Sequence, residues 1–442
     1  MKIIECLQPA KAILSRQVPA EFTAVSPALK QRTKEIFGTE DPEQAVRQII
    51  DEVRHRGDAA LRDYALKIDR VELTSLEVSK QQINDACQQV DEELVSALKL
   101  AAERICSFHL AQKSAIWNEV TEPGLAQLIR PLERVGIYAP GGTACYPSTV
   151  LMTAIPAKVA GVKEIILVTP PGRGGAVPSP TLVAADIAGV DHIFCVGGAQ
   201  AIAALAFGTE SIPKVDKICG PGNIFVVLAK KLVYGAVDID GLQGPSEVLI
   251  IADETANPEY CAADLLAQAE HDPLASAILI TTSQWLADEV NKEIEQQLEN
   301  LPRQAIITES LQNRGMLVVV TNIDEAIELA NLYAPEHLCL VVDKATSYIY
   351  KVLNAGCIFI GENSLVALGD YVAGPSHVLP TGGSARFSSP LNISDFIKFT
   401  NLITIDETSL KQLSRAAATM ARAEGFEAHA RAVEKRLKAK GE

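Results

Sequence analysis

The sequence lacks any apolar stretch that approaches the roughly 20 residues needed for a membrane-spanning helix. It also lacks the apolar core of a secretory signal, because Glu5 interrupts the short run that begins at Met1. These absences argue against a membrane protein and against export. We therefore expect a cytoplasmic protein.

Paired cysteines are also missing. The nine cysteines are odd in number and widely scattered, and no two of them form a C-x-x-C motif. Most have apolar neighbours, as Cys195 and Cys357 do, so we expect reduced core thiols rather than a disulfide framework. Cys145 lies near a glycine-rich turn, and its role stays open.

Basic charge is scarce relative to acidic charge. The chain has 40 Lys and Arg residues against 55 Asp and Glu residues, which gives a net charge of −15. This balance argues against nucleic acid as a partner and against attachment to a membrane surface. Aromatic residues make up 5% and charged residues 21% of the chain, a composition typical of a soluble α/β enzyme. A length of 442 residues leaves room for about three domains of roughly 150 residues.

Two series of short apolar runs alternate with helical segments and predict parallel sheets built from βαβ units. The expected strands are 135–139, 165–169, 193–196 and 217–219 in the first series, and 248–252, 277–281, 317–320, 339–342 and 358–360 in the second. The glycine-rich break at 241–245 separates the two series. Residues 41–118 have helical periodicity, and another helix is expected from about 408 to 438.

These patterns predict an α/β protein with two lobes of incomplete Rossmann-like architecture, a helical N-terminal region and a small C-terminal helical appendage. We expect an N-terminal segment (1–26), a first lobe (27–137 with 245–387), a second lobe (138–244) and a C-terminal segment (388–442).

Glycine-rich turns follow three strands of the first series, although none matches the G-x-G-x-x-G fingerprint of dinucleotide-binding proteins. They lie at 139–143, 197–200 and 219–223, and the last two lead directly into helices. Such junctions offer backbone N–H groups to phosphates at the carboxyl edge of a sheet. Taken singly, each turn is better explained by a structural role, but three turns on one edge make a nucleotide site an equal alternative.

Histidine is rare, and four of the seven histidines occur in unusual contexts: His271, His337, His377 and His429. Gln268 and His271 stand three residues apart at a helix end, so one cation could contact both. With Asp370 and His429 downstream, these residues form an N/O ligand set without thiolate, which suits a catalytic zinc-class ion. The alternative is that His271 only caps its helix.

A carboxylate and an imidazole stand side by side at Glu336 and His337, after the stiffening Pro335. Such a pair can act as general acid and base if both side chains enter a cleft. The alternative is a solvated turn. The segment 369–383, which contains Asp370 and His377, is so rich in Gly and Pro that it predicts a shaped loop.

At this point the sequence resembles the histidinol dehydrogenases. The matching stretches, in the family's order over nearly the whole chain, are VGIYAPGGT (135–143), VGGAQAIAALAFG (196–208), CGPGNIF (219–225), GPSEVL (244–249), QAEH (268–271), YAPEHL (333–338) and the loop 369–383. The resemblance implies a zinc-dependent oxidation of L-histidinol to L-histidine through a bound aldehyde, with two hydride transfers to NAD, in a cytoplasmic homodimer. It also implies two α/β lobes with small terminal segments exchanged between subunits.

The resemblance carries roles onto individual positions. Glu336 would activate water and His337 would act as general base. The remaining implied residues are Gln268, His271, Asp370 and His429 as zinc ligands; Tyr138, Gln200 and Asn223 as NAD contacts; and Ser246 and Glu424 as substrate contacts, together with His337 and the zinc ligands.

Two other functions remain open on the residues alone. A zinc hydrolase would explain the metal ligands and Glu336 but not the glycine turns. A two-lobed small-molecule binding protein is the other alternative, although bacterial examples usually carry export signals. Production of NADH with histidinol distinguishes the dehydrogenase from the hydrolase, and turnover distinguishes it from a binding protein.

Overall fold

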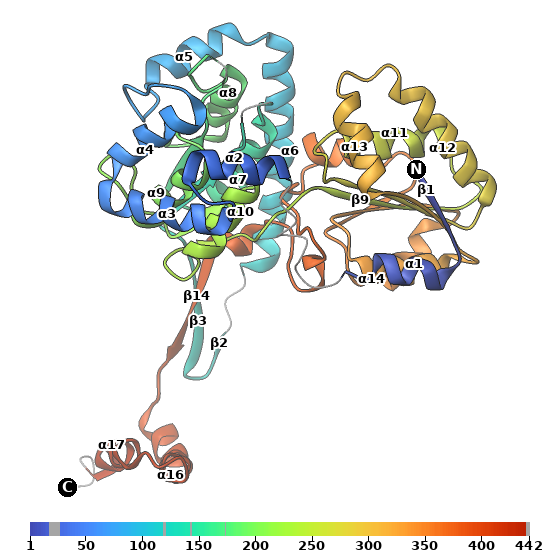
Figure 1. Cartoon of the computed structure of the whole chain (residues 1–442). Coiled ribbons are helices and arrows are strands. Elements are labelled where there is room, and N and C mark those ends of the chain that lie inside the picture. Colours follow the sequence, from blue (N-terminus) through green and yellow to red (C-terminus); the bar gives the residue numbers. More distant parts are fainter. Residues whose placement is uncertain (17–26, 118–120, 142–143, 173, 439–442) are drawn as a thin grey trace. The chain divides into compact units, whose positions relative to one another are not determined.

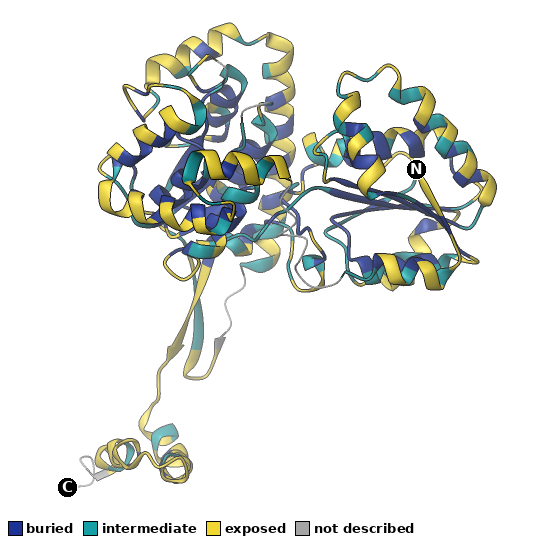
Figure 2. Ribbon diagram, in the orientation of Figure 1, coloured by how far each residue is buried: buried dark blue, intermediate teal, exposed yellow. Residues whose placement is uncertain are grey.

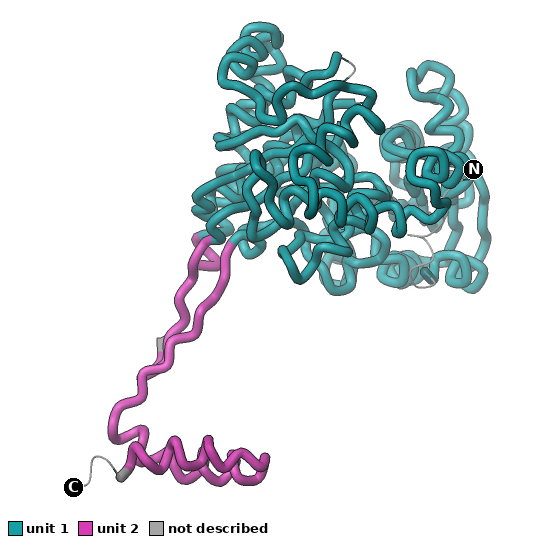
Figure 3. The backbone as a smooth tube through the Cα atoms, turned by 60° about the vertical axis from the view of Figure 1, so that its left-hand side comes forward, with its two compact units in different colours: residues 1–113, 132–396 teal, residues 114–131, 397–442 magenta. Residues whose placement is uncertain are grey.

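The computed structural model describes residues 1–16, 27–117, 121–141, 144–172 and 174–438. By contacts, the chain separates into a large unit, Met1–Lys113 with Leu132–Phe396, and a small unit, Ser114–Pro131 with Ile397–Glu442 (Figure 3). None of the described helices has the length and apolarity to cross a membrane.

One half of the large unit is a parallel sheet of six strands with helices on both faces (Figure 1). The strands in spatial order are β1 (Lys2–Glu5), β11 (Gly315–Val319), β10 (Ser276–Thr281), β9 (Glu247–Ala252), β12 (His337–Val341) and β13 (Cys357–Ile360). The covering helices are α11 (Pro258–Ala269), α12 (Gln284–Leu298), α13 (Gln304–Arg314), α1 (Leu7–Leu14) and α14 (Ile323–Tyr333).

Alternation along β9 explains why this sheet is buried on both faces. Val248 and Ile250 belong to the cluster formed with α11, α12 and α13. Leu249 and Ile251 belong to the opposite cluster, formed with α1 and α14. All four side chains are fully buried, so the strand appears in the sequence as a continuous apolar run. Figure 2 shows these central strands as buried and the outer helix surfaces as exposed.

The other half of the large unit is a parallel sheet of five strands. In spatial order these are β6 (His192–Cys195), β5 (Glu164–Thr169), β4 (Arg134–Tyr138), β7 (Lys217–Cys219) and β8 (Asp238–Ile239). The crossover helices are α7 (Pro147–Ala160), α8 (Ser179–Ala188), α9 (Gly198–Phe207) and α10 (Ile224–Val233). The preceding helices are α2 (Pro27–Phe37), α3 (Pro42–Arg56), α4 (Asp58–Tyr64) with a π-helical turn (Ala65–Asp69), α5 (Lys80–Gln89) and α6 (Glu92–Ile116).

The small unit contains a three-stranded antiparallel sheet and two helices. Its elements are β2 (Thr121–Glu122), β3 (Leu125–Pro131), β14 (Ile397–Ile403), α16 (Glu407–Ala423) and α17 (Glu427–Lys438). Residues 408–438 therefore form two helices rather than the single helix expected from the sequence. The break falls at Gly425, which adopts a positive φ of 83° that residues with a Cβ rarely adopt.

The α/β fold class and the two parallel sheets are as predicted, but the expected grouping of residues needs three corrections. β4 lies inside the five-stranded sheet, and α3 packs on α9 and α10, so residues 27–137 do not join 245–387. The start of the supposed N-terminal segment instead supplies β1 to the six-stranded sheet, whereas residues 17–26 lie outside the described part. The small unit takes in residues 114–131, which the sequence did not assign to it.

The cysteines are free, as predicted, but fewer are buried than their neighbours suggested. Four are buried, namely Cys195, Cys219, Cys261 and Cys339. Cys145 is exposed, and Cys357 is only partly buried. Apolar neighbours in the sequence therefore do not place a thiol in the core when its strand or loop lies at an edge.

Candidate active site

The predicted acid–base pair lies where two neighbouring parallel strands begin. His337 is the first residue of β12 and stands opposite Val248 in β9. This register brings Glu336 beside the residues that precede Val248: its Oε2 accepts hydrogen bonds from Ser246 Oγ at 2.7 Å and from the Glu247 N–H at 2.8 Å. Glu336 and His337 are 6% and 2% exposed, so they are not in a solvated turn.

The same backbone segment orients the imidazole of His337. Its Nδ1 lies 2.9 Å from the carbonyl oxygen of Glu247, which can only accept, so Nδ1 carries a proton. In the neutral ring Nε2 is then the basic atom, and it lies 3.5 Å from Asp370 Oδ1. Burial alone would lower the pKa of His337, but the Glu336 and Asp370 carboxylates outweigh it and raise the pKa well above its usual value.

Three of the four predicted zinc ligands lie in the large unit. Gln268 is 2% exposed near the end of α11. His271 lies just beyond that helix, tied to it by a 3.3 Å bond from its N–H to the Gln268 carbonyl, and its ring is exposed. Asp370 is in α15 (Val366–Tyr371), where burial raises its pKa but the charges of His337, His377 and His271 lower it overall. The Asp370 carboxylate lies 3.5 Å from His337 Nε2, and the Asp370 carbonyl lies 2.7 Å from His377 Nδ1.

The predicted metal ligands differ in how the structure places them. Across the described residues, no group of three or more His, Cys, Asp and Glu side chains is arranged to hold a metal ion. Glutamine is outside that set, and the Gln268 amide nitrogen is a buried polar atom without a hydrogen-bond partner in the described part of the chain. Glu424 and His429 belong to the small unit, where both are exposed.

The predicted cofactor residues cluster at the carboxyl edge of the five-stranded sheet. Tyr138 ends β4, is 3% exposed, and accepts a 3.1 Å hydrogen bond from the Gly198 N–H at its hydroxyl. Burial raises the pKa of this phenol to about 12. Gln200 is 1% exposed. Asn223 caps α10, because its side chain accepts hydrogen bonds from the N–H groups of Phe225 and Val226, the second and third residues of that helix. Gly142 and Thr143 of the first glycine turn lie outside the described residues.

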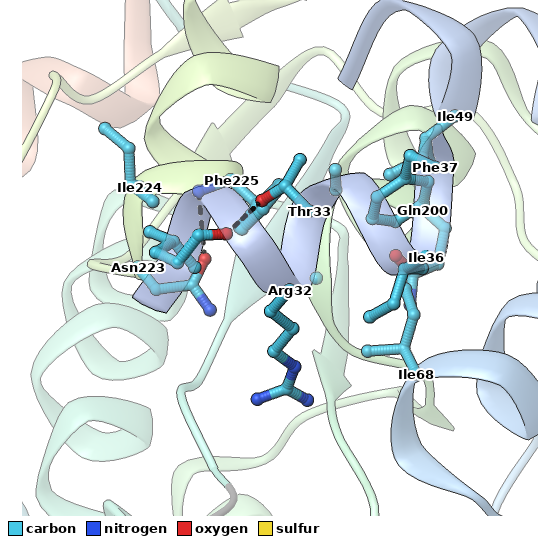
Figure 4. Close-up of a pocket in the computed structure, with 13 residues that line it drawn as sticks. Arg32, Thr33, Ile36, Phe37, Ile49, Ile68, Gln200, Asn223, Ile224 and Phe225 are labelled. Carbon is cyan, nitrogen blue, oxygen red and sulfur yellow. Dashed lines mark hydrogen bonds between the residues drawn. The ribbon is translucent and has the colours of Figure 1, made fainter. Parts of the chain in front are cut away.

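A cavity of about 230 Å³ opens beside this edge (Figure 4). The turn residues Gly198, Gln200 and Asn223 line it, together with Arg32 and Phe37 of α2. The Gln200 Oε1 atom is buried without a hydrogen-bond partner among the described atoms. Because small-molecule sites usually occupy at least roughly 300 Å³, this cavity fits part of a dinucleotide rather than the whole molecule.

Comparison with known proteins decides the family. Residues 32–437 match the profile of histidinol dehydrogenases. This chain belongs to the histidinol dehydrogenase family. The prediction of a dehydrogenase from this family is therefore confirmed, and the hydrolase and binding-protein alternatives are set aside.

Relatives match the chain over nearly all of its length. Histidinol dehydrogenase from Dehalococcoides mccartyi (strain CBDB1) is 58% identical over 99% of this chain and 100% of its own. The enzyme from Clostridium acetobutylicum is 51% identical over 92% of this chain and 96% of its own. The crystal structure of histidinol dehydrogenase from Elizabethkingia anophelis is 38% identical and superposes with a TM-score of 0.90, covering 100% of this chain and 99% of that one.

Two residues of this family member support the acid–base pair and were not expected from the sequence. Arg16 donates to both carboxylate oxygens of Glu247 at 2.6 and 2.7 Å, and the two side chains are only 10% and 4% exposed. The guanidinium also stacks on the ring of Tyr333, 3.8 Å from its centre. Since the backbone of Glu247 contacts both Glu336 and His337, this ion pair fixes the position of both catalytic candidates.

Replacing Arg16 by methionine is expected to destabilise the fold by roughly 3–5 kcal/mol, because the Glu247 carboxylate would stay buried without its cation. Urea unfolding monitored by circular dichroism measures the change. Lys11→Met is the matched control, because Lys11 pairs with Glu328 on the surface, where the two side chains are 30% and 54% exposed. Equal stability of the two variants would contradict the assigned role of Arg16.

His377, whose role the sequence left open, ties the loop 369–383 to the five-stranded half. Its Nδ1 lies 2.7 Å from the carbonyl oxygen of Asp370 and therefore donates to it. Its Nε2 then accepts from Thr149 Oγ1 of α7 at 3.3 Å. The neighbouring Ser376 hydroxyl donates to the Met152 carbonyl of the same helix at 3.0 Å. His377 thus orients the backbone of Asp370.

Asp69 should make the stability of the folded protein depend on pH. It is the last residue of the π-helical turn and lies near Tyr138 and Arg32. Burial raises its pKa from 3.8 to about 6, so the folded state binds more protons than the unfolded state between these values. Stability from this group is therefore lost as pH rises through that window. Because the carboxylate is partly exposed, we expect Asp69→Asn to gain only about 1 kcal/mol at pH 7.5. In thermal unfolding, the gain should vanish near pH 4; a pH-independent gain would contradict this account.

Proposed function

We propose that this member of the family oxidises L-histidinol to L-histidine by way of L-histidinal, with two successive hydride transfers to NAD, as the last step of histidine biosynthesis in the cytoplasm. The observation that supports this most directly is the buried pair Glu336 and His337 anchored on Ser246 and Glu247. Because the Glu336 carboxylate and the His337 imidazole are bound to different atoms of Ser246 and Glu247, each can transfer a proton in a different half-reaction.

His337 is suited to remove the hydroxyl proton of the alcohol. Its Nδ1 proton is committed to the Glu247 carbonyl, so in the neutral ring Nε2 accepts a proton on the side of Asp370. A cation bound by Asp370 would offset the carboxylate charge that raises the pKa of His337, and so favour this neutral ring. In the proposed mechanism His337 takes this proton in the first half-reaction. Glu336 then orients and deprotonates the water that adds to the aldehyde, while Ser246 and Glu247 hold its carboxylate in place.

The residues present fit a zinc ion, with Gln268, His271 and Asp370 as ligands from the large unit and His429 as the fourth. The lowered pKa of Asp370 suits a side chain that binds a cation, and Gln268 would contribute its amide oxygen. When bound, zinc would hold the substrate's imidazole and amino nitrogens and so orient the carbinol carbon. Gln268, His271, His337, Asp370, Ser246, Glu424 and His429 are the proposed substrate contacts.

The residues present also fit NAD at the turns after β4, β6 and β7. Tyr138, Gln200 and Asn223 are the proposed contacts. Gln200 Oε1, which has no hydrogen-bond partner among the described residues, lies beside the cavity and could accept from a ligand donor. When bound, NAD would accept the hydride from each substrate. The glycine turns leave room for its phosphates at the helix N-termini.

We infer a homodimer from the surface of the small unit. Helix α16 exposes Leu413 and Met420, and the turn between α16 and α17 exposes Phe426, at 53–64% of their surface. The apolar side of a helix normally packs against another surface. A second subunit would cover this side, and Glu424 and His429 would then complete the site of that subunit.

A subunit-mixing experiment tests the shared site. His429→Ala and His271→Asn subunits should each be inactive, and the purified mixed dimer should recover about half of the wild-type activity, because one of its two sites contains no substitution. Differently tagged subunits allow its isolation. The control is the mixture of the two inactive homodimers, each with its own tag, measured before their subunits exchange. A mixed dimer without activity would show that each site is built from one chain.

The function itself is tested by NADH absorbance. Purified protein with bound zinc should reduce NAD when L-histidinol is added, with two NADH formed for each histidine. Omission of histidinol is the control. Absence of NADH formation, or a stoichiometry of one with the aldehyde as final product, would overturn the proposal.

A further inference from the structure

A buried lysine lies beneath the third glycine turn. Lys230 in α10 is 1% exposed, and its ammonium donates to the Gly220 carbonyl at 2.9 Å, to Asp240 Oδ1 at 2.5 Å and to Gln243 Oε1 at 2.9 Å. Each of its three N–H groups therefore has an acceptor. Asp240, whose side chain is 1% exposed, uses its other oxygen to accept from the Gly220 N–H at 2.7 Å.

Gly220 is thus held at both of its backbone polar groups. Asp240 binds the N–H and Lys230 binds the carbonyl, in a residue with a φ of +114°. The turn is also pressed against β4, since a Cβ at Gly220 would lie 2.1 Å from the Tyr138 carbonyl oxygen. Tyr138, whose carbonyl lies against Gly220, and Asn223, which follows Gly220 in the same turn, are two of the proposed NAD contacts.

The third acceptor connects the turn to the acid–base pair. Gln243, which accepts from Lys230, is the first residue of the segment 243–247. Gly244, the residue after Gln243, donates from its N–H to Thr381 Oγ1 at 2.6 Å. Ser246 in turn binds Glu336. One ammonium therefore joins the turn 219–223 to the segment 243–247.

We propose that Lys230 is a positioning residue for the cofactor: with Asp240 it fixes the turn 219–223 in the conformation that binds NAD. It touches neither NAD nor histidinol itself. A buried ion pair adds little net stability compared with apolar packing, so stability alone does not require a lysine here. This inference rests on the proposed function only in taking NAD as the ligand of the turn.

The same sheet contains a control. Lys217 at the start of β7 is 7% exposed at its side chain and pairs with Asp238 and Asp395, each at 3.1 Å. Lys217→Met removes a buried cation, as Lys230→Met does, but its partners do not bind Gly220. Loss of fold stability should therefore be comparable, whereas loss of NAD affinity should not.

The test measures NAD affinity by titration calorimetry, the KM values for NAD and histidinol, and thermal unfolding, all with zinc-loaded dimer. Lys230→Met should weaken NAD binding and raise its KM roughly tenfold or more, since the turn loses a charged hydrogen bond. The KM for histidinol should stay within about threefold, and Lys217→Met should change NAD affinity less than about twofold. Equal effects of the two lysine variants on NAD affinity would overturn the proposal.

The nearly isosteric Asp240→Asn variant decides the question if Lys230→Met does not fold. It keeps the volume but can no longer accept from both Gly220 and Lys230, so NAD affinity should again fall. Folded Asp240→Asn with wild-type NAD affinity would overturn the proposal. Wild-type protein that binds NAD but does not oxidise histidinol would instead refute the proposed function, and the calorimetric comparison would still test Lys230.

Discussion

Asp370→Ala is expected to leave the purified protein without zinc and to reduce histidinol oxidation at least about a thousandfold, since loss of metal-assisted catalysis removes several kcal/mol of transition-state stabilisation. Asp370 is the carboxylate nearest His337 Nε2, and its lowered pKa keeps it ionised and able to bind a cation. The fold should survive, because the residue lies on a short helix at the edge of the site.

Metal analysis of the purified protein and thermal unfolding separate the possible outcomes of this substitution. Asp272→Asn is the matched control: its side chain accepts from the Leu274 N–H in the turn beside His271, and asparagine can still accept there. The control should retain zinc and turnover. Asp370→Ala protein with normal zinc content and normal activity would refute the assigned ligand set.

Glu336→Gln should separate the two half-reactions. Glutamine can still accept from Ser246 Oγ and the Glu247 N–H, so the site keeps its shape while the carboxylate that activates water is lost. Because general-base catalysis contributes roughly a hundredfold or more, oxidation of histidinal should slow by at least that factor. Oxidation of histidinol to the aldehyde should slow much less.

His337→Ala should impair both half-reactions, because it removes the base and a substrate contact together. Single-turnover NADH formation, measured with histidinol and separately with histidinal, gives the rates for both variants. A Glu336→Gln enzyme that is slow only in the alcohol step would reverse the roles assigned to these two neighbours.

The central strands could be predicted because burial on both faces makes them continuous apolar runs, as in 248–252 and 165–169. The small unit could not be predicted in the same way. β3 and β14 are mostly exposed or half-buried, so they have no apolar run, and they pair across positions as distant as Gln127 and Asn401. Their pairing is set by tertiary structure rather than by a local pattern.

The candidate site was predictable where chemistry-bearing residues adjoin in sequence, as Glu336 and His337 do. The neighbours that fix them were not, since Arg16 and Glu247 are separated by 231 positions and an ion pair at that distance leaves no local signature. The zinc ligands Gln268, His271, Asp370 and His429 remain predictions, as do the NAD contacts.

The position of β1 has a consequence for synthesis on the ribosome. Residues 2–5 leave the ribosome long before β11, the strand with which β1 pairs in the described part of the chain and whose register partners begin at Met316. At about 5–20 residues per second, this partner follows roughly 15–60 seconds later. Throughout that interval the nascent chain carries an unpaired strand. Arg16 also lacks its ion-pair partner until Glu247 has been synthesised. We expect ribosome-bound chains that stop before residue 315 to bind chaperones through their first residues, and full-length chains to release them.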